Sequence, residues 1–364
     1  MQQFAQELVD YIIDDVAAAA TTNEIATCSS VCPRWLPRSR KHLFHHITVS
    51  QTTLLQFLDS SPHLLPFVRS LDIRIKYEPF AEPPVAQLQN FSTLVELCIH
   101  APAMLPAEQL DFECWLQTAI QGFGAACPNL TRFELTFASD ITLPIIADIM
   151  SGLPRLTHLR LDGGKANGIT QSAGVLPAGA FPPQLHSLDL NLRRGTSLLF
   201  EWLVAHDAPP IFTSLALKGY ACSARTAPID AYLERFGRKI ETLSLAYWVD
   251  ADCDLSSESF TEQTRLFEAH ALEFTPALEH LTLLWQHPAT LPATLTLLSS
   301  ARLFTVTMQL CNTRDGDWPQ IDAILASPRF ASLQRLVFTE TFTETDEESL
   351  KELMPLASAR RILQ

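Results

Sequence analysis

Residues 156–161 read Leu-Thr-His-Leu-Arg-Leu, and this short pattern is the repeating unit of the chain. Large apolar residues occupy its first, fourth and sixth positions. The fourth and sixth positions are two residues apart, so both side chains point to one face of an extended strand. Between residues 68 and 338 the pattern occurs ten times, as Val68-Leu71-Ile73, Leu94-Leu97-Ile99, Leu130-Phe133-Leu135, Leu156-Leu159-Leu161, Leu185-Leu188-Leu190, Phe212-Leu215-Leu217, Ile240-Leu243-Leu245, Leu278-Leu281-Leu283, Leu303-Val306-Met308 and Leu333-Leu336-Phe338.

The spacing of these copies is typical of a leucine-rich repeat. Neighbouring copies begin 25 to 38 residues apart, which gives a repeat of about 29 residues with two longer insertions. One strand cannot bury its apolar face alone, but parallel strands stacked side by side form a continuous core. We therefore expect an α/β fold, a leucine-rich-repeat solenoid with a parallel inner sheet and outer helices over residues 51–345.

Most segments between the copies have apolar residues spaced by three and four, which predicts helices. The predicted helices are 110–125, 144–153, 197–205, 229–236, 260–274 and 319–326. Residues 346–364 begin with a capping-type acid, Asp346, and are predicted to form a C-terminal capping helix.

The composition favours a folded protein that binds other proteins. Hydrophobic residues make up 47% of the 364 residues and charged residues only 18%. The net charge of -14 argues against nucleic acid or an anionic membrane as the main partner. No apolar run reaches the roughly 18 residues of a membrane span, and no secretory signal is recognised. Eight cysteines without paired metal spacing fit reduced thiols, so we expect a cytoplasmic or nuclear protein without a metal or cofactor.

Residues 1–50 lack the repeat pattern and predict a separate domain of three short helices. The three expected apolar stripes consist of Leu8, Ile12 and Ile13, then Ile25, Cys28, Cys32 and Trp35, then Leu43, Phe44 and Ile47.

The sequence of this segment resembles that of a known family. It reads Phe4-Ala5-Gln6-Glu7-Leu8-Val9-Asp10-Tyr11-Ile12-Ile13, then Ser30-Val31-Cys32-Pro33-Arg34-Trp35, then Pro37-Arg38-Ser39-Arg40-Lys41-His42-Leu43-Phe44. These residues resemble an F-box, especially the type common in mushroom-forming fungi. The chain departs from that pattern where Phe4-Ala5 replace the usual Leu-Pro opening, and where Pro33 should break the second helix.

The resemblance implies the substrate-recognition subunit of an SCF-type, cullin-based ubiquitin ligase. The F-box would dock on a Skp-type adaptor, and through it on a cullin, while the repeats hold a protein substrate for ubiquitin-dependent degradation. The receptor would position its substrate and contribute no catalytic residue, so it is not itself an enzyme. The adaptor face carried over by the resemblance consists of Phe4, Leu8, Ile12, Val31, Cys32 and Trp35.

A second interpretation belongs to another class of protein. The first residues could serve only as a cap on a leucine-rich-repeat scaffold, because a solenoid must hide the core of its first repeat. An exposed apolar surface on residues 4–35 would favour the receptor. Burial of that surface against residues 68–75 would favour the scaffold.

The variable strand positions predict where a substrate could bind. In the copies that begin at residues 68 to 156 these positions carry seven formal charges of both signs. In the copies that begin at residues 212 to 303 the same positions are neutral except for Lys218. Aromatic residues follow these strands, and aromatic side chains often dominate binding energy. The predicted substrate-binding residues are Lys218, Tyr220, Tyr247, Trp248, His280 and Trp285; the alternative is that Tyr220 and Trp248 only fill space beside the sheet.

Two further motifs are weak signals for chemistry. Asp250, Asp252 and Asp254 alternate as in a calcium loop, but Leu255 and Thr261 replace its required Gly and Glu. The run Gly163-Gly164-Lys165 lacks the rest of a phosphate-binding loop. We therefore expect a solvated insertion and an ordinary loop at these places.

Overall fold

A computed structural model describes residues 5–19, 22–76, 88–164, 167–171, 180–220, 227–247, 271–286, 291–310, 317–339 and 351–363. The chain forms two compact units. Unit 1 contains residues 1–139 and 145–156, and unit 2 contains residues 140–144 and 157–364.

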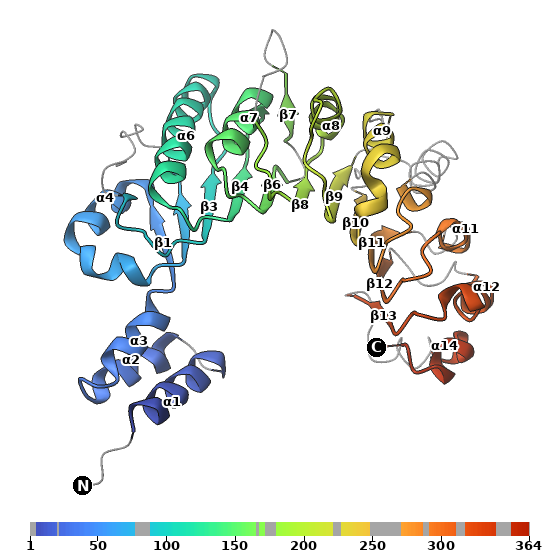
Figure 1. Cartoon of the computed structure of the whole chain (residues 1–364), viewed down its shortest axis with the longest axis horizontal. Coiled ribbons are helices and arrows are strands. Elements are labelled where there is room, and N and C mark those ends of the chain that lie inside the picture. The colour runs from blue at the N-terminus through green and yellow to red at the C-terminus, as the bar shows by residue number, and fades with distance from the viewer. Residues whose placement is uncertain are drawn as a thin grey trace. The chain divides into compact units, whose positions relative to one another are not determined.

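Unit 1 begins with three helices, as the sequence predicts. They are α1 (Gln6–Ala19), α2 (Thr22–Val31) and α3 (Leu36–Leu43), coloured blue in Figure 1. Helix α2 ends two residues before Pro33, which agrees with the break expected there. Trp35 consequently lies in the turn before α3, so the predicted stripe from Ile25 to Trp35 does not run along one helix.

Four parallel strands follow in unit 1, in the order β1-β2-β3-β4. They are β1 (His46–Ser50), β2 (Ser70–Arg74), β3 (Glu96–Ala101) and β4 (Arg132–Phe137). Their connections include α4 (Gln51–Ser60), the 3-10 helix η1 (Pro62–Phe67) and α6 (Pro106–Ala126). The prediction that Ile47 ends a third helix is wrong, because Ile47 lies in β1. Phe44-Ile47-Val49 is a further copy of the repeat pattern, hidden beside the helical segment.

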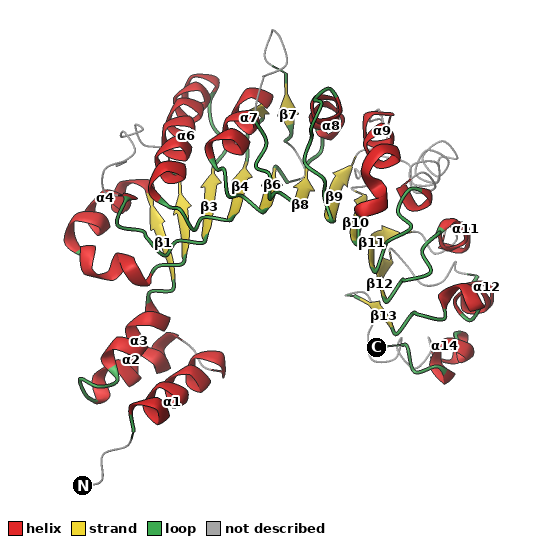
Figure 2. Cartoon of the chain, viewed as in Figure 1, coloured by secondary structure: helices red, strands yellow, loops and turns green. Residues whose placement is uncertain are grey.

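Seven parallel strands form the main sheet of unit 2, in the order β6-β8-β9-β10-β11-β12-β13. They are β6 (His158–Asp162), β8 (Ser187–Asn191), β9 (Ser214–Tyr220), β10 (Thr242–Tyr247), β11 (His280–Gln286), β12 (Thr305–Leu310) and β13 (Arg335–Phe338). The short strands β5 (Ile141–Thr142) and β7 (Ile169–Thr170) pair separately. Figure 2 shows α8 (Thr196–Val204), α9 (Ala227–Phe236), α11 (Leu291–Leu297) and α12 (Trp318–Leu325) on one side of these strands.

The repeated apolar residues stack in register and form the core. In unit 1, Leu71, Leu97 and Phe133 lie side by side and are buried. In unit 2 the equivalent buried row contains Leu159, Leu188, Leu215, Leu243, Leu281, Val306 and Leu336. All ten predicted copies therefore lie on parallel strands, which confirms the predicted α/β repeat architecture.

Most of the predicted outer helices are also confirmed. Helices α6, α8, α9 and α12 cover four of them, and α7 (Leu143–Gly152) covers a fifth. The predicted helix at 260–274 lies mostly outside the described residues, although residues 271–273 are helical.

The C-terminal segment differs from the single helix expected over residues 346–364. Residues 351–353 are helical, but Pro355 starts a separate short helix, α14 (Pro355–Ala359), because proline fits only the first turn of a helix. The N–H of Leu336 then donates to the carbonyl of Ile362 at 2.6 Å, so the segment borders β13. Residues 346–350 lie outside the described part of the chain.

Asp322 holds this C-terminal segment in place. Its carboxylate is buried and accepts the backbone N–H groups of Leu356 and Ala357, each at 2.8 Å. Replacing Asp322 with alanine removes the acceptor for both groups and should lower the free energy of unfolding by about 2 kcal/mol. Chemical denaturation followed by circular dichroism would measure this loss, and unchanged stability would contradict the role given to Asp322.

Candidate functional site

The three N-terminal helices are joined by a small core and an ion-pair cluster. Val9 and Ile13 from α1 and Ile25 from α2 are buried. Asp14 on α1 accepts a hydrogen bond from Nε of Arg38 on α3 at 2.6 Å, and Nε2 of His42 lies 2.7 Å from the same carboxylate. The hydrogen bond from Arg38 holds the pKa of Asp14 well below its usual range. Helix α1 is therefore fixed on α3 by its Asp14 side.

The outward side of α1 exposes three large apolar side chains. Leu8, Tyr11 and Ile12 are 53%, 71% and 41% exposed, and their spacing of three and four places them on one helical face. Val31 at the end of α2 is 58% exposed. We call these four residues the apolar surface. Concentrated exposed apolar side chains on a short segment mark an interaction site more often than scattered ones do.

The six predicted adaptor-binding residues differ in their exposure to solvent. Leu8, Ile12 and Val31 are exposed, whereas Cys32 and Trp35 are half-buried, and Phe4 lies outside the described residues. The predicted shared face of Leu8, Ile12 and Ile13 is wrong. Adjacent residues on a helix point about 100° apart, so Ile13 packs inward while Ile12 points outward. Tyr11 was missed, although its spacing of three from Leu8 could have identified it.

Acid should weaken the packing of α1 on α3, because it protonates the Asp14 carboxylate. Because the pKa of Asp14 is lower in the folded protein, its stabilisation is present above the unfolded pKa of about 3.9 and is lost as the pH falls below that value. Asp14 is partly exposed, so Asp14→Asn should lower stability by only about 1 kcal/mol at neutral pH.

Hydrogen exchange over residues 6–19 at neutral and acidic pH would test this prediction. Because intrinsic amide exchange slows in acid, the quantity compared is the protection factor at each pH. We expect lower protection in Asp14→Asn at neutral pH and a smaller further fall in protection in acid than in the wild type. An identical acid response in both proteins would rule out Asp14 as the titrating group.

The exposed face of the unit 1 sheet is charged, and its charges pair with one another. Asp72 is buried, with Nε2 of His100 at 3.2 Å and Nη2 of Arg74 at 3.7 Å from its carboxylate. Glu96 and Arg132 lie 3.9 Å apart on neighbouring strands. These pairs partly neutralise the mixed charges that the sequence places on this face.

The sheet face over β9 to β12 in unit 2 is neutral, as predicted. Its half-buried side chains include Ser214, Ala216, Thr242, Ser244, Thr282, Thr305 and Thr307. Nζ of Lys218 donates to the carboxylate of Asp189 at 3.0 Å, so the one charge predicted there is already paired. This face consequently offers short polar side chains without net charge.

The predicted aromatic rim lies partly within the described chain. Tyr220 in β9 and Tyr247 in β10 are paired across the two strands, and Trp285 belongs to β11. The side chains of these three residues, and all of Trp248, lie outside the described part of the structure. His280 is exposed, and its ring lies 6.1 Å from that of Phe304, an exposed residue that the sequence reasoning missed because it precedes its strand.

Within the described residues, the two weak motifs for chemistry do not form a reaction centre. Gly164 has a φ of 60° and donates its N–H to Asp162 at 3.0 Å, which identifies an ordinary turn. Asp250, Asp252, Asp254 and Lys165 lie outside the described residues. Over the ranges that the structure describes, no three His, Cys, Asp or Glu side chains gather as metal ligands. None of the described helices is long and apolar enough to cross a bilayer.

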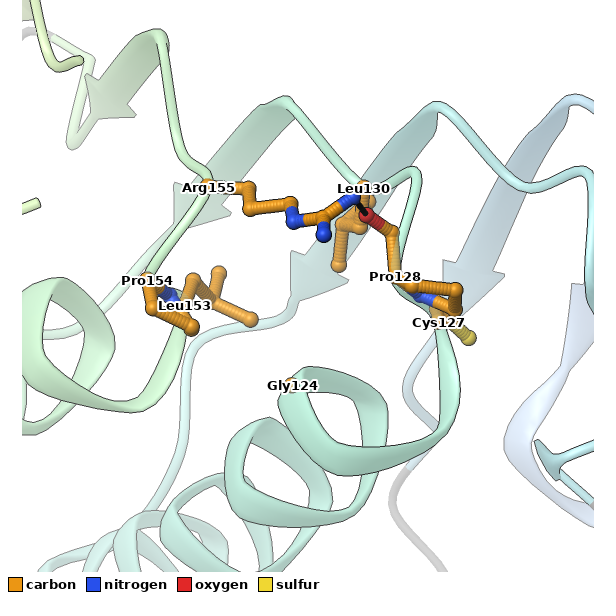
Figure 3. A pocket seen from close by; sticks show the side chains of 7 residues that line it. All are labelled: Gly124, Cys127, Pro128, Leu130, Leu153, Pro154 and Arg155. Carbon is orange, nitrogen blue, oxygen red and sulfur yellow. Dashed lines mark hydrogen bonds between the residues drawn. The ribbon is translucent and has the colours of Figure 1, made fainter.

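A small pocket lies between the ends of α6 and α7 in unit 1. It has a volume of about 120 Å³, and Figure 3 shows Arg155 reaching across to the carbonyl of Pro128, at 2.9 Å. The thiol of Cys127 is directed toward the carbonyl of Leu88, away from Leu153 and Pro154, and burial raises its pKa to about 12. A protonated thiol is a poor nucleophile, so this pocket has the character of a packing gap.

Comparison with known proteins adds little. No family model and no curated protein sequence matches the chain. A structure of a Bacteroides fragilis protein is similar at 11% identity and a TM-score of 0.38, over 80% of this chain and 73% of that one. A chain of the LRIM1/APL1C complex is similar at 12% identity and a TM-score of 0.27, over 82% of this chain and 56% of that one. A sugar phosphate isomerase/epimerase from Parabacteroides distasonis gives 11% identity and a TM-score of 0.20, over 64% of this chain and 96% of that one. Such low TM-scores assign no function.

Proposed function

We propose that this protein is a non-catalytic, protein-binding receptor whose N-terminal helices dock on a Skp-type adaptor of a cullin-based ubiquitin ligase. The observation that carries the proposal is the apolar surface of Leu8, Tyr11, Ile12 and Val31. An N-terminal segment that served only as a cap would turn such side chains inward. Their exposure leaves them available to a partner and therefore supports the receptor over the scaffold.

The energy available from this surface is sufficient for a specific contact. Covering a large apolar side chain stabilises a complex by roughly 1.5–3 kcal/mol when burial is complete. Exposed side chains of this kind on α1 and at the end of α2 can supply the central anchors of an interface. The ion pairs of Asp14 with Arg38 and His42 keep α1 in one position, which reduces the entropy lost on docking.

The repeat sheet of unit 2 is the proposed substrate surface. The neutral face over β9 to β12 exposes short hydroxyl side chains that can exchange hydrogen bonds with a protein. Lys218, Tyr220, Tyr247, Trp248, His280 and Trp285 are the residues proposed to surround the substrate. The receptor would work in the cytoplasm or nucleus without a cofactor.

Purification of the full chain together with a Skp-type adaptor from its own organism would test this function. The proposal predicts a stable one-to-one complex in size-exclusion chromatography. A folded chain that elutes apart from the adaptor at micromolar concentrations of both would overturn the ligase role and leave the repeat scaffold.

A further inference from the structure

The segment around α3 carries a net positive charge in this acidic protein. Residues 25–58 contain Arg34, Arg38, Arg40 and Lys41 and no Asp or Glu, so this segment carries a formal charge of +4. Because the whole chain carries -14, the other residues together carry -18. A segregated charge of this kind creates a local field opposite to that of the rest of the surface.

At the end of α3, Lys41, His46 and Arg69 lie close enough to His45 to act on it electrostatically. The carbonyl of His45 accepts the N–H groups of Arg69 and Ser70, each at 2.9 Å, which places the start of β2 beside the end of the α3 segment. Arg40 and Lys41 lie in the last turn of α3. We call Arg40, Lys41, His45, His46 and Arg69 the basic patch. His45, His46 and Arg69 are exposed, and Arg40 and Lys41 are half-buried.

The cations of the basic patch lack acidic partners within the described chain. Most other sheet cations have one, as Arg74 pairs with Asp72, Arg132 with Glu96 and Lys218 with Asp189. Arg40, Lys41 and Arg69 form no ion pair with a described carboxylate, and Asp14 is already occupied by Arg38 and His42. Burial, followed by the positive charges of Arg69, His42, His46 and Lys41, lowers the pKa of His45, which agrees with uncompensated positive charge at this place.

We propose that the basic patch binds a short acidic segment of a protein partner, independently of the adaptor surface on α1. An acidic peptide is favoured for two reasons: its charge is opposite to that of the basic patch, and its negative charge covers only a small area. A short Asp- or Glu-rich segment can pair with Arg40, Lys41 and Arg69 without reaching the acidic remainder of the chain. Nucleic acid or an anionic membrane presents negative charge over a much larger area and would be repelled by the remaining -18.

Fluorescence anisotropy of the full chain with a labelled glutamate-rich peptide tests the proposal. The same peptide with glutamine in place of glutamate, a single-stranded DNA of equal length and phosphatidylserine vesicles serve as competing probes. We expect binding of the glutamate peptide that weakens with salt, and no comparable binding of the other probes. The double variant Arg40→Gln, Lys41→Gln should bind the peptide at least about tenfold more weakly.

A matched variant in unit 2 separates a specific site from general attraction. Arg238 and Lys239 are also adjacent and exposed, so Arg238→Gln, Lys239→Gln removes the same charge and should change binding by less than about twofold. Arg69→Gln, which lies just before β2 and outside α3, tests the patch if the α3 variant does not fold. Equal losses in the two double variants, or tighter binding of DNA or vesicles than of the peptide, would overturn the proposal. A chain that fails to bind the adaptor would not contradict the peptide-binding proposal, because the peptide titration contains no adaptor.

Discussion

Replacing Leu8 and Ile12 together with aspartate should abolish binding of the Skp-type adaptor while the protein stays folded. Both side chains are exposed on α1, so the change removes little from the core of Val9, Ile13 and Ile25. In the complex, by contrast, each aspartate would bury a charge without a partner. Such a charge costs several kcal/mol, so we expect the dissociation constant to rise more than about a hundredfold.

The control for this experiment is a second exposed apolar pair. Leu353 and Leu356 in the C-terminal segment are 41% and 49% exposed, and Leu353→Asp, Leu356→Asp adds the same charge far along the chain. Calorimetric titration should give wild-type affinity for this control. Equal losses in the two double variants would mean that added charge, rather than the face of α1, disrupts the complex.

Replacing Gly124 with alanine should destabilise unit 1 by about 3 kcal/mol or more, although alanine has the higher helix propensity. Gly124 lies inside α6, where alanine is normally better than glycine by about 1 kcal/mol. A Cβ at this position would lie 1.8 Å from the carbonyl oxygen of Gly152 in α7, and a backbone atom cannot move aside as a side chain can. The helices must therefore separate, and overpacking of this severity outweighs the gain in propensity.

The neighbouring exposed residue, Ala125, allows the reverse substitution as a comparison. Ala125→Gly should lower the free energy of unfolding by only about 1 kcal/mol, because it changes propensity alone. Urea denaturation of the three proteins would rank them as wild type, Ala125→Gly and Gly124→Ala in decreasing stability. A Gly124→Ala protein more stable than the wild type would show that α6 and α7 are not in close contact at these glycines.

The sequence predicted the repeat fold well because each copy repeats the same local constraint. Within each copy two buried residues are two positions apart, as Leu159 and Leu161 or Leu188 and Leu190 are, and only a strand satisfies this period over so many copies. The copy Phe44-Ile47-Val49 escaped detection because Phe44 and Ile47 are also spaced as on a helix, and they directly follow helical residues. A short apolar run of this kind fits both structures, and tertiary packing decides between them.

The candidate site could be predicted only in part, since it depends on which side of a helix is covered. Leu8, Ile12 and Ile13 are equally apolar in the sequence, and only the packing of α1 on α2 and α3 buries Ile13 and exposes the others. The ion pair of Lys218 with Asp189 likewise joins two repeats. Predicting this ion pair requires the strand register, which the repeat pattern provides. It also requires knowing that the long Lys218 side chain extends past a neighbouring residue to reach Asp189.

The most direct test of the proposed adaptor contact is photo-cross-linking from position 11. Tyr11 is the most exposed residue of the apolar surface, so a benzoylphenylalanine there should leave the fold unchanged. The same group at Gln56, an exposed position on α4, is the control. We expect a cross-link to the Skp-type adaptor from position 11 and none from position 56. A cross-link only from position 56, or none from position 11 in a mixture where the two proteins do bind, would contradict the proposal that α1 forms the adaptor contact.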